Sequence, residues 1–148
     1  MARLADLMTG LQRRLGLAPG AAAPDGSYKV VFDDTLAVTC MERGASTAVM
    51  QARIGKLPKD NPASEEKLGH LLNHNLARLQ TQQEVLAADR EDGCVVLYRV
   101  LSLEDLSQRE FDEAMESFVN CLAFWRSCFA MGGRPRRTEA TPPVMIFP

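Results

Sequence analysis

The sequence predicts an α+β domain in which a twisted, mainly antiparallel sheet packs with helices in the order α-β-β-β-α-β-β-α. Three observations support this fold class. Leucines recur at helical spacing near the N-terminus and again in the middle of the chain. Short apolar segments with turn residues between them follow each of these stretches. A long amphipathic segment then opens with a complete helix-start pattern.

The overall composition limits the classes of protein that the chain can represent. With 148 residues, 46% of them hydrophobic and 24% charged, the chain has the size and make-up of one globular domain. A net charge of −2 offers no electrostatic reason to bind nucleic acid or an acidic membrane. No apolar run approaches the roughly 20 residues that span a bilayer. We therefore expect one domain over residues 1–131, with no nucleic-acid partner and no insertion into a membrane.

The first predicted helix covers residues 2–15. Its apolar stripe consists of Leu4, Leu7, Met8, Leu11 and Leu15. Gly16 suits the position just past a helix end, where a left-handed backbone is common. The stretch LAPGAAAPDG that follows is predicted to be a linker.

The next three segments are predicted to be strands: Ser27–Asp33, Leu36–Met41 and Thr47–Ile54. Asp33 and Asp34 are turn residues, so the first two strands should form an antiparallel hairpin. A strand in a small protein usually hides one face and exposes the other. Here Val30 and Phe32 lie on one face of the first strand, and Val31 lies on the other. Both faces are therefore apolar, and the second face needs a cover.

A second helix is predicted over roughly residues 64–80, capped by either Asn61 or Ser64. Its leucine stripe consists of Leu68, Leu71, Leu72, Leu76 and Leu79. Two more strands follow, Glu84–Ala88 and the segment CVVLYRVL at residues 94–101, joined by a turn that contains an Asp-Gly pair. The last of these strands is again apolar on both faces.

The last helix has the clearest start in the chain. Ser107 and Glu110 form a capping box, and Leu106 and Phe111 have the spacing of a hydrophobic staple. A broad apolar face then includes Phe111, Met115, Phe118, Leu122, Trp125 and Phe129. Gly132-Gly133 should end the helix, and residues 132–148, rich in proline, are predicted to form a flexible tail.

The search for a reaction centre finds only weak candidates. Glu66, His70 and His74 share one stripe of the second helix and could bind a divalent ion, but a polar flank beside a leucine face explains them better. Asp33 and Asp34 are better explained as turn residues than as paired catalytic acids. The four cysteines are Cys40, Cys94, Cys121 and Cys128. Without a C-x-x-C pair, they are best explained as reduced thiols of a cytosolic protein. We expect no enzyme activity and no cofactor.

The sequence resembles a known family. The matching segments are VFDDTLAVTC in the first hairpin, ARIGKLP at the end of the third strand, LGHLLNHNLARL in the second helix, and GCVVLYRVLSLEDLSQREF followed by ESFVNCLAFWRSCF. Together with the element order, they resemble the class I type III secretion chaperones, the Tir-chaperone-like group. The resemblance runs from about Ala2 to Ala130. The basic RPRR of the tail departs from the family's usual acidity.

This resemblance implies a cytoplasmic bacterial homodimer that binds the N-terminal region of a secreted effector, here called the client, in a partly extended form. The client would thereby stay soluble and competent for secretion. Carried over by position, the effector-binding residues would include Leu4, Leu7, Leu11, Leu15, Val31, Phe32, Leu36, Val38 and Met50. The dimer interface would include Leu68, Leu71, Leu72, Leu76, Leu79, Val85 and Leu86. The sequence leaves open which sheet face binds the client. Because the effector-binding residues carried over by position come from both faces, some of them must belong to the core.

Two alternatives stay open at this point. A regulatory binding protein that sequesters a transcriptional regulator would have the same sequence features. A small enzyme that uses the cysteines or the pair His70 and His74 is the less favoured alternative.

Overall fold

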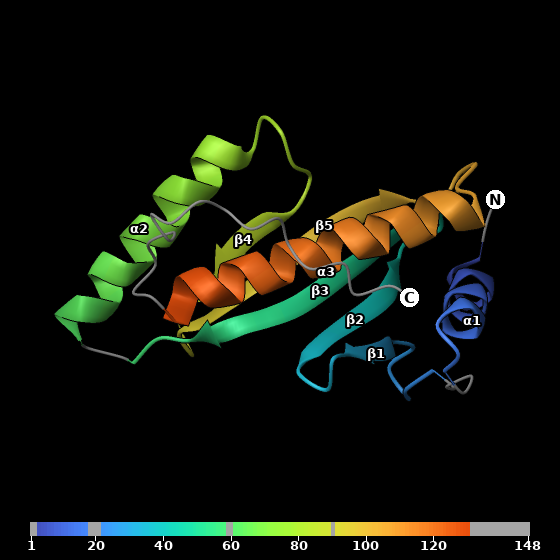
Figure 1. The fold of residues 1–148 in the computed structure, drawn as a ribbon, viewed down its shortest axis with the longest axis horizontal. Coiled ribbons are helices and arrows are strands. Elements are labelled where there is room, and N and C mark those ends of the chain that lie inside the picture. Colours follow the sequence, from blue (N-terminus) through green and yellow to red (C-terminus); the bar gives the residue numbers. More distant parts are fainter. Residues whose placement is uncertain (1–2, 18–21, 59–60, 90, 131–148) are drawn as a thin grey trace.

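The computed structural model describes residues 3–17, 22–58, 61–89 and 91–130. Figure 1 shows its helices and strands in chain order. They are α1 (Leu4–Arg14), β1 (Tyr28–Phe32), β2 (Leu36–Arg43), β3 (Thr47–Lys56), α2 (Pro62–Arg78), β4 (Val85–Ala88), β5 (Cys94–Ser102) and α3 (Gln108–Ala130). The predicted α+β class and element order are confirmed. The predicted C-terminal tail, together with Gly132-Gly133, lies outside the described residues.

The strands form one sheet in the order β1-β2-β3-β5-β4, and every neighbouring pair is antiparallel. The predicted first hairpin is confirmed, with Asp33 and Asp34 at φ 50° and 58° in its turn. Asp tolerates this left-handed backbone better than most residues. β3 and β5 extend beyond their predicted ends because their backbones continue to pair as far as Lys56 and Ser102.

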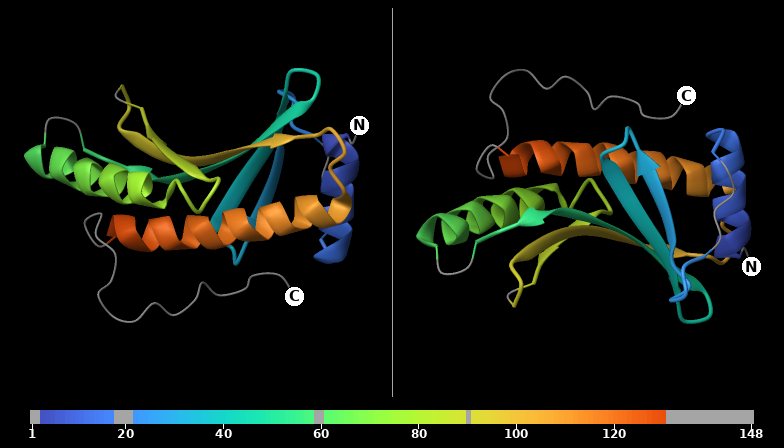
Figure 2. Two further views of the ribbon diagram at one scale, coloured as in Figure 1. Left: turned by 90° about the horizontal axis from the view of Figure 1, so that it is seen from above. Right: turned by 90° about the horizontal axis from the view of Figure 1, so that it is seen from below.

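One face of the sheet, here called the inner face, packs against α3. Val38, Met50 and Leu97 on this face are each at most 1% exposed. They meet the broad apolar face predicted for α3, in which Phe111, Phe118 and Trp125 are completely buried. Figure 2 shows α3 lying along this side of the sheet. Each such side chain contributes roughly 1.5–3 kcal/mol through burial, so this layer is the main source of stability.

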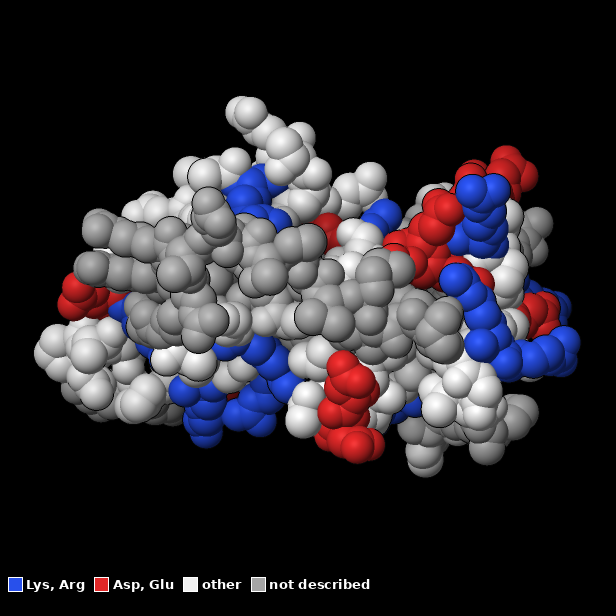
Figure 3. All heavy atoms as spheres, viewed as in Figure 1, with Lys and Arg blue, Asp and Glu red and all other residues white. Residues whose placement is uncertain are grey.

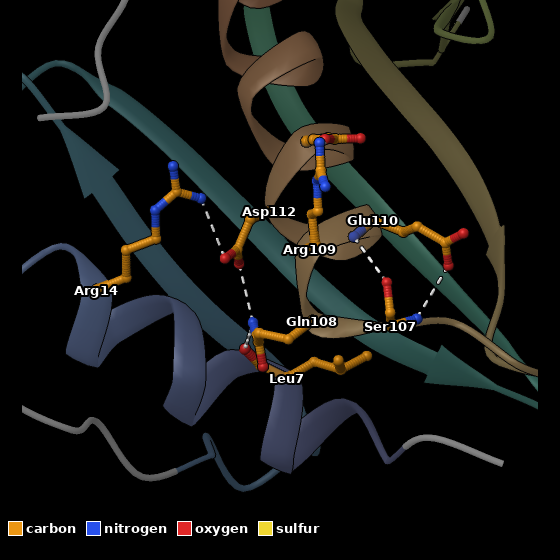
Figure 4. Close-up of polar contacts among 8 residues, drawn as sticks. Leu7, Arg14, Ser107, Gln108, Arg109, Glu110 and Asp112 are labelled. Atoms are coloured by element: carbon orange, nitrogen blue, oxygen red, sulfur yellow. Dashed lines mark hydrogen bonds and ion pairs between the residues drawn. The ribbon is translucent and has the colours of Figure 1, made fainter.

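The predicted capping box at the start of α3 is confirmed (Figure 4). The Ser107 amide donates to Glu110 Oε2 at 3.0 Å, and the Glu110 amide donates to Ser107 Oγ at 3.1 Å. Two amides at the helix start thereby gain acceptors that the helix itself does not supply.

α1 covers one end of the core, beside the start of α3 (Figures 1 and 2). Its apolar stripe is buried, with Leu11 at 0% exposure. Polar contacts add to this packing, as Figure 4 shows: Gln108 Nε2 donates to the Leu7 carbonyl at 3.0 Å, and Arg14 pairs with Asp112 at 3.1 Å. Asp112 also accepts from Gln108 at 2.9 Å. The two helices are therefore joined by a buried carboxylate with two donors.

α2 begins at Pro62, two residues before the predicted start. Of the two predicted caps, Asn61 and Ser64, the residue at the cap position is Asn61. Its side chain accepts a hydrogen bond from the Ala63 amide at 3.0 Å, and Pro62 fits the first helical turn. α2 lies near β4 and the C-terminal half of α3. Asn75 Oδ1 accepts from the Leu86 amide at 3.4 Å, and Lys67 lies 3.7 Å from the centre of the Phe129 ring. No helix in the described part of the chain has an apolar stretch long enough to cross a membrane.

Candidate functional site

The second face of the sheet, here called the outer face, has no helix of the described residues packed over it (Figure 2). Strand register places the following residues on it: Lys29, Val31, Ala37, Thr39, Met41, Arg43, Thr47, Val49, Gln51, Arg53, Val85, Ala87, Val96, Tyr98, Val100 and Ser102. None of them is buried. Val31 is 44% exposed and Val100 is 54% exposed, so valines face solvent across the sheet.

The chemistry of the outer face suits an extended polypeptide. Paired apolar residues cross its middle, including Val49 opposite Val100 and Val85 opposite Tyr98. Lys29, Arg43 and Arg53 add positive charge, and no acidic residue shares the face within the strands. An extended chain places alternate side chains on such a surface and can satisfy its own backbone by joining a strand edge.

An open pocket of about 800 Å³ lies at the α1 end of the sheet. It is lined by Arg3, Ala5, Ala22, Asp25, Gly26, Tyr28, Met41, Glu42, Arg43, Ala45 and Leu103. Met41 and Arg43 belong to both the pocket and the outer face, so the two form one continuous surface. Hydrogen bonds from Ser27 lower the pKa of the Asp25 carboxyl, which keeps this side of the pocket negatively charged.

Most of the residues that the sequence suggested for effector binding lie inside the protomer. Leu4, Leu7, Leu11, Phe32, Leu36, Val38 and Met50 belong to the buried core, Leu15 is partly buried, and Val31 is exposed. Of this set, Val31 alone is open to a partner without rearrangement. The accessible apolar positions that the set lacked include Met41, Val49, Val96, Tyr98 and Val100. The apolar character of both faces of CVVLYRVL was the sequence feature that could have found them.

The residues suggested for the dimer interface divide into two groups. Leu72 and Leu76 on α2, and Leu79 directly after its last residue, are 40%, 68% and 40% exposed. Leu68 and Val85 are partly buried, while Leu71 and Leu86 belong to the core of the protomer. The exposed leucines form a stripe on the outward side of α2, here called the α2 stripe. Exposed leucines at helical spacing are typical of a surface that another helix covers.

The two histidines of α2 have different neighbours. His70 Nε2 lies 3.5 Å from Glu66 Oε1, whereas the His74 ring packs against Phe124 and Trp125 with centroids 5.6 and 5.5 Å away. Burial, with a smaller effect from Arg78, lowers the pKa of His74. The described residues contain no group of three side chains placed to hold a metal ion.

All four cysteines are free, and Cys40, Cys121 and Cys128 are buried. Burial raises the pKa of the Cys40 and Cys121 thiols to about 12, and it also raises that of Cys128. A thiol that stays protonated is a poor nucleophile and a poor metal ligand. Cys94 is only partly buried.

Charged side chains on the face shown in Figure 3 form small separate groups of both signs outside the grey atoms. Neither sign makes a continuous field there.

Comparisons with known proteins give the family. The model of the Tir chaperone protein (CesT) family matches residues 6–126, and the chain belongs to this family. None of the curated protein sequences compared with the chain matches it significantly.

Solved structures share the fold. A chain of the ExsC–ExsE complex is 16% identical, with a TM-score of 0.68 over 91% of this chain and 96% of that chain. A chain of the complex between the Yersinia pestis type III secretion chaperone SycH and a stable fragment of YscM2 is 21% identical, with a TM-score of 0.60 over 80% and 96%. A chain of the HopA1–SchA chaperone–effector complex is 20% identical, with a TM-score of 0.62 over 82% and 91%.

Proposed function

We propose that the protein is a type III secretion chaperone that binds the N-terminal region of an effector in a partly extended form and keeps it soluble and competent for secretion. The observation that carries this proposal is the outer face, where Val31 and Val100 are 44% and 54% exposed on a sheet whose other face packs against α3. Family membership and the similarity to the SchA chain of the HopA1–SchA chaperone–effector complex support it.

The outer face also indicates the chemistry of the client segment. Its apolar centre favours a segment with hydrophobic residues at alternate positions, because these side chains project to the same side of an extended chain. Lys29, Arg43 and Arg53 favour acidic residues flanking them. Such a segment would be prone to aggregate if it were free in the cell, which gives a physical reason for a chaperone.

The same proposal includes a homodimer in the bacterial cytoplasm, formed through the α2 stripe with Val85 and its neighbours on β4. It includes no catalytic step. The raised pKa of the buried thiols and the packing of the His74 ring against Trp125 do not favour the alternative of a thiol or metal enzyme. A protein that sequesters a transcriptional regulator would use the same surface and would differ in the identity of its partner.

Purification of the tagged protein from its native bacterium, followed by mass spectrometry of the bound polypeptide, tests the proposal. We expect an exported protein whose N-terminal region is protected from limited proteolysis. Val100→Asp should abolish this complex without unfolding the chaperone, since Val100 is 54% exposed. Ser127→Asp, an exposed position on α3, is the control and should bind as the parent does. A transcriptional regulator as the sole partner, or full binding by Val100→Asp, would contradict the proposal.

A further inference from the structure

We propose that the two α2 helices of the homodimer cross in an antiparallel direction at Gly69, with Leu76 of each protomer seated against the partner's Gly69. This inference rests on the homodimer of the proposed function and specifies how its two chains meet. Three features of α2 carry it: the open space beside Gly69, the position of Leu76 on the same side of the helix, and the opposite charges of the two helix ends.

Gly69 leaves an open notch in the middle of α2. The residue is exposed and lies well inside the helix. Glycine at such a position lowers helix stability relative to alanine, because its backbone loses more freedom on folding. The backbone of Gly69 is not in the left-handed region that favours glycine. A Cβ atom there would meet no described atom within 4 Å outside the backbone of its own helix, so the notch is open to a second molecule.

Leu76 projects from the same side of α2 as the notch. It follows Gly69 by seven residues, which is almost two helical turns and a rise of about 10 Å. With 68% of its surface exposed, Leu76 is the most exposed large apolar residue in the described part of the chain. One side of α2 therefore carries both a hollow and a projecting side chain.

A hollow and a projection at this spacing are self-complementary. A two-fold axis that passes midway between Gly69 and Leu76, near Leu72, places each Leu76 on the partner's Gly69, so that the same contact forms twice. Packed helices usually lie 8–10 Å apart, and a glycine at the crossing lets the backbones approach more closely. The crossing removes the most exposed apolar side chain of the protomer from water.

The charges at the ends of α2 favour the antiparallel direction. Glu65 lies in the first turn and Arg78 in the last turn. Antiparallel helices bring the first turn of each close to the last turn of the other, which places opposite charges together. Parallel helices would bring the two Glu65 carboxylates together, and their dipoles would also repel. A second copy of α2 therefore fits this surface in both shape and charge.

The dissociation constant of the full-length dimer, measured by sedimentation equilibrium, tests the crossing. Gly69→Leu fills the notch and should raise this constant at least about tenfold, and Gly69→Ala should raise it less. Ala77→Leu is the matched control. It adds a leucine at an exposed position of the same helix, about 100° around the axis from Leu76, and should keep the parent's constant.

The same position should respond in the opposite direction when no dimer forms. Gly69→Ala combined with Leu76→Asp should have a higher urea midpoint than Leu76→Asp alone, because alanine favours the helix. A substitution that stabilises the protomer and weakens the dimer cannot owe its effect on the dimer to misfolding. A lower midpoint in the combined variant would mean that Gly69 is needed inside the protomer, and it would overturn the proposal.

Oxidative cross-linking tests the direction of the helices. Gly69→Cys combined with Leu76→Cys should give a disulfide-linked dimer, because the close crossing brings the two positions within the roughly 4.4–6.8 Å that a disulfide spans between Cα atoms. Each single variant should cross-link no more than the parent does. Two copies of one position lie about 10 Å apart along the helices in this register.

An unchanged dissociation constant for Gly69→Leu would overturn the crossing at Gly69, and so would cross-linking of either single variant. The homodimer of the proposed function would survive both results, because Leu76→Asp tests it separately. A Leu76→Asp variant that stays dimeric would overturn the crossing together with the α2 interface. Client binding is tested by Val100→Asp and does not depend on any of these outcomes.

Discussion

Leu11 illustrates how burial decides the role of a single residue. The sequence placed it on an apolar helical stripe that could face either a client or the core, and the structure buries it completely. Leu11→Asp should therefore unfold the protein instead of yielding a folded chaperone without its client. The stripe pattern is the same in both cases, because helical periodicity identifies an apolar side and not the molecule that covers it.

Leu11→Ala gives the quantitative prediction. It should lower the free energy of unfolding by about 2–5 kcal/mol, because it removes a completely buried side chain and leaves a cavity. Leu17→Ala, at a position that is 42% exposed, should change it by no more than about 0.5 kcal/mol. Urea unfolding followed by circular dichroism measures both. Equal losses would mean that α1 is not packed as the structure has it.

His74 makes stability depend on pH. Its pKa is lowered in the folded protein, so the unfolded chain binds a proton at a higher pH than the folded chain does. The contribution of His74 is therefore complete above its ordinary pKa of 6.5 and decreases as the pH falls through 6.5 toward the lowered value. His74→Phe keeps a ring against Phe124 and Trp125 but cannot bind the proton. The urea midpoint of this variant should fall less between pH 7 and pH 5 than that of the parent.

His70→Gln is the matched control for this measurement, because it removes a histidine from the same helix that does not pack on Trp125. The urea midpoint of His70→Gln should fall between pH 7 and pH 5 by as much as that of the parent. An identical pH response of His74→Phe and the parent would show that His74 is not the group responsible.

At the scale of elements, local patterns predicted the helices well because their determinants are close in sequence. The capping box of α3 needs only Ser107 and Glu110. By contrast, nothing local predicted that Glu84 is 2% exposed, where it accepts from Ser117 Oγ at 2.7 Å and pairs with Arg99 at 3.4 Å. Its partners Ser117 and Arg99 come from α3 and β5, so the residues next to Glu84 in the sequence could not have predicted them. Long-range polar contacts of this kind are formed by the fold and are not visible in a window of sequence.

The contact between α1 and α3 gives a prediction at this scale. Asp112 is buried and accepts from both Arg14 and Gln108 (Figure 4), so Asp112→Ala should lower the free energy of unfolding by about 1–3 kcal/mol. Hydrogen exchange should accelerate in α1 more than in the sheet. Glu113→Ala removes the exposed pair with Arg109 and should cost no more than about 0.5 kcal/mol. Similar losses in both variants would contradict a specific role for the buried carboxylate.

At the scale of the whole molecule, the sequence predicted that the strands have two apolar faces but not which face α3 covers. That choice depends on where the chain returns after β5, which is a matter of topology. The effector-binding set inferred by position therefore contained mostly inner-face residues such as Val38 and Met50. The leucines of α2 likewise could not be divided from the sequence into buried and exposed residues. Leu71 is buried in the protomer, while its neighbour Leu72 is 40% exposed.

The α2 stripe gives the prediction for the whole molecule. Leu76 is 68% exposed in the protomer, so a charge there should not disturb the fold, yet it would be buried and unpaired in a dimer formed through α2. Light scattering during size-exclusion chromatography should give twice the 16.3 kDa chain mass for the parent and 16.3 kDa for Leu76→Asp. The variant should keep the parent's circular dichroism. Asn73→Asp adds the same charge at an exposed position on the same helix, and this control should remain dimeric. A parent that elutes at the mass of one chain, or a Leu76→Asp variant that keeps the doubled mass, would exclude the α2 stripe as the dimer interface.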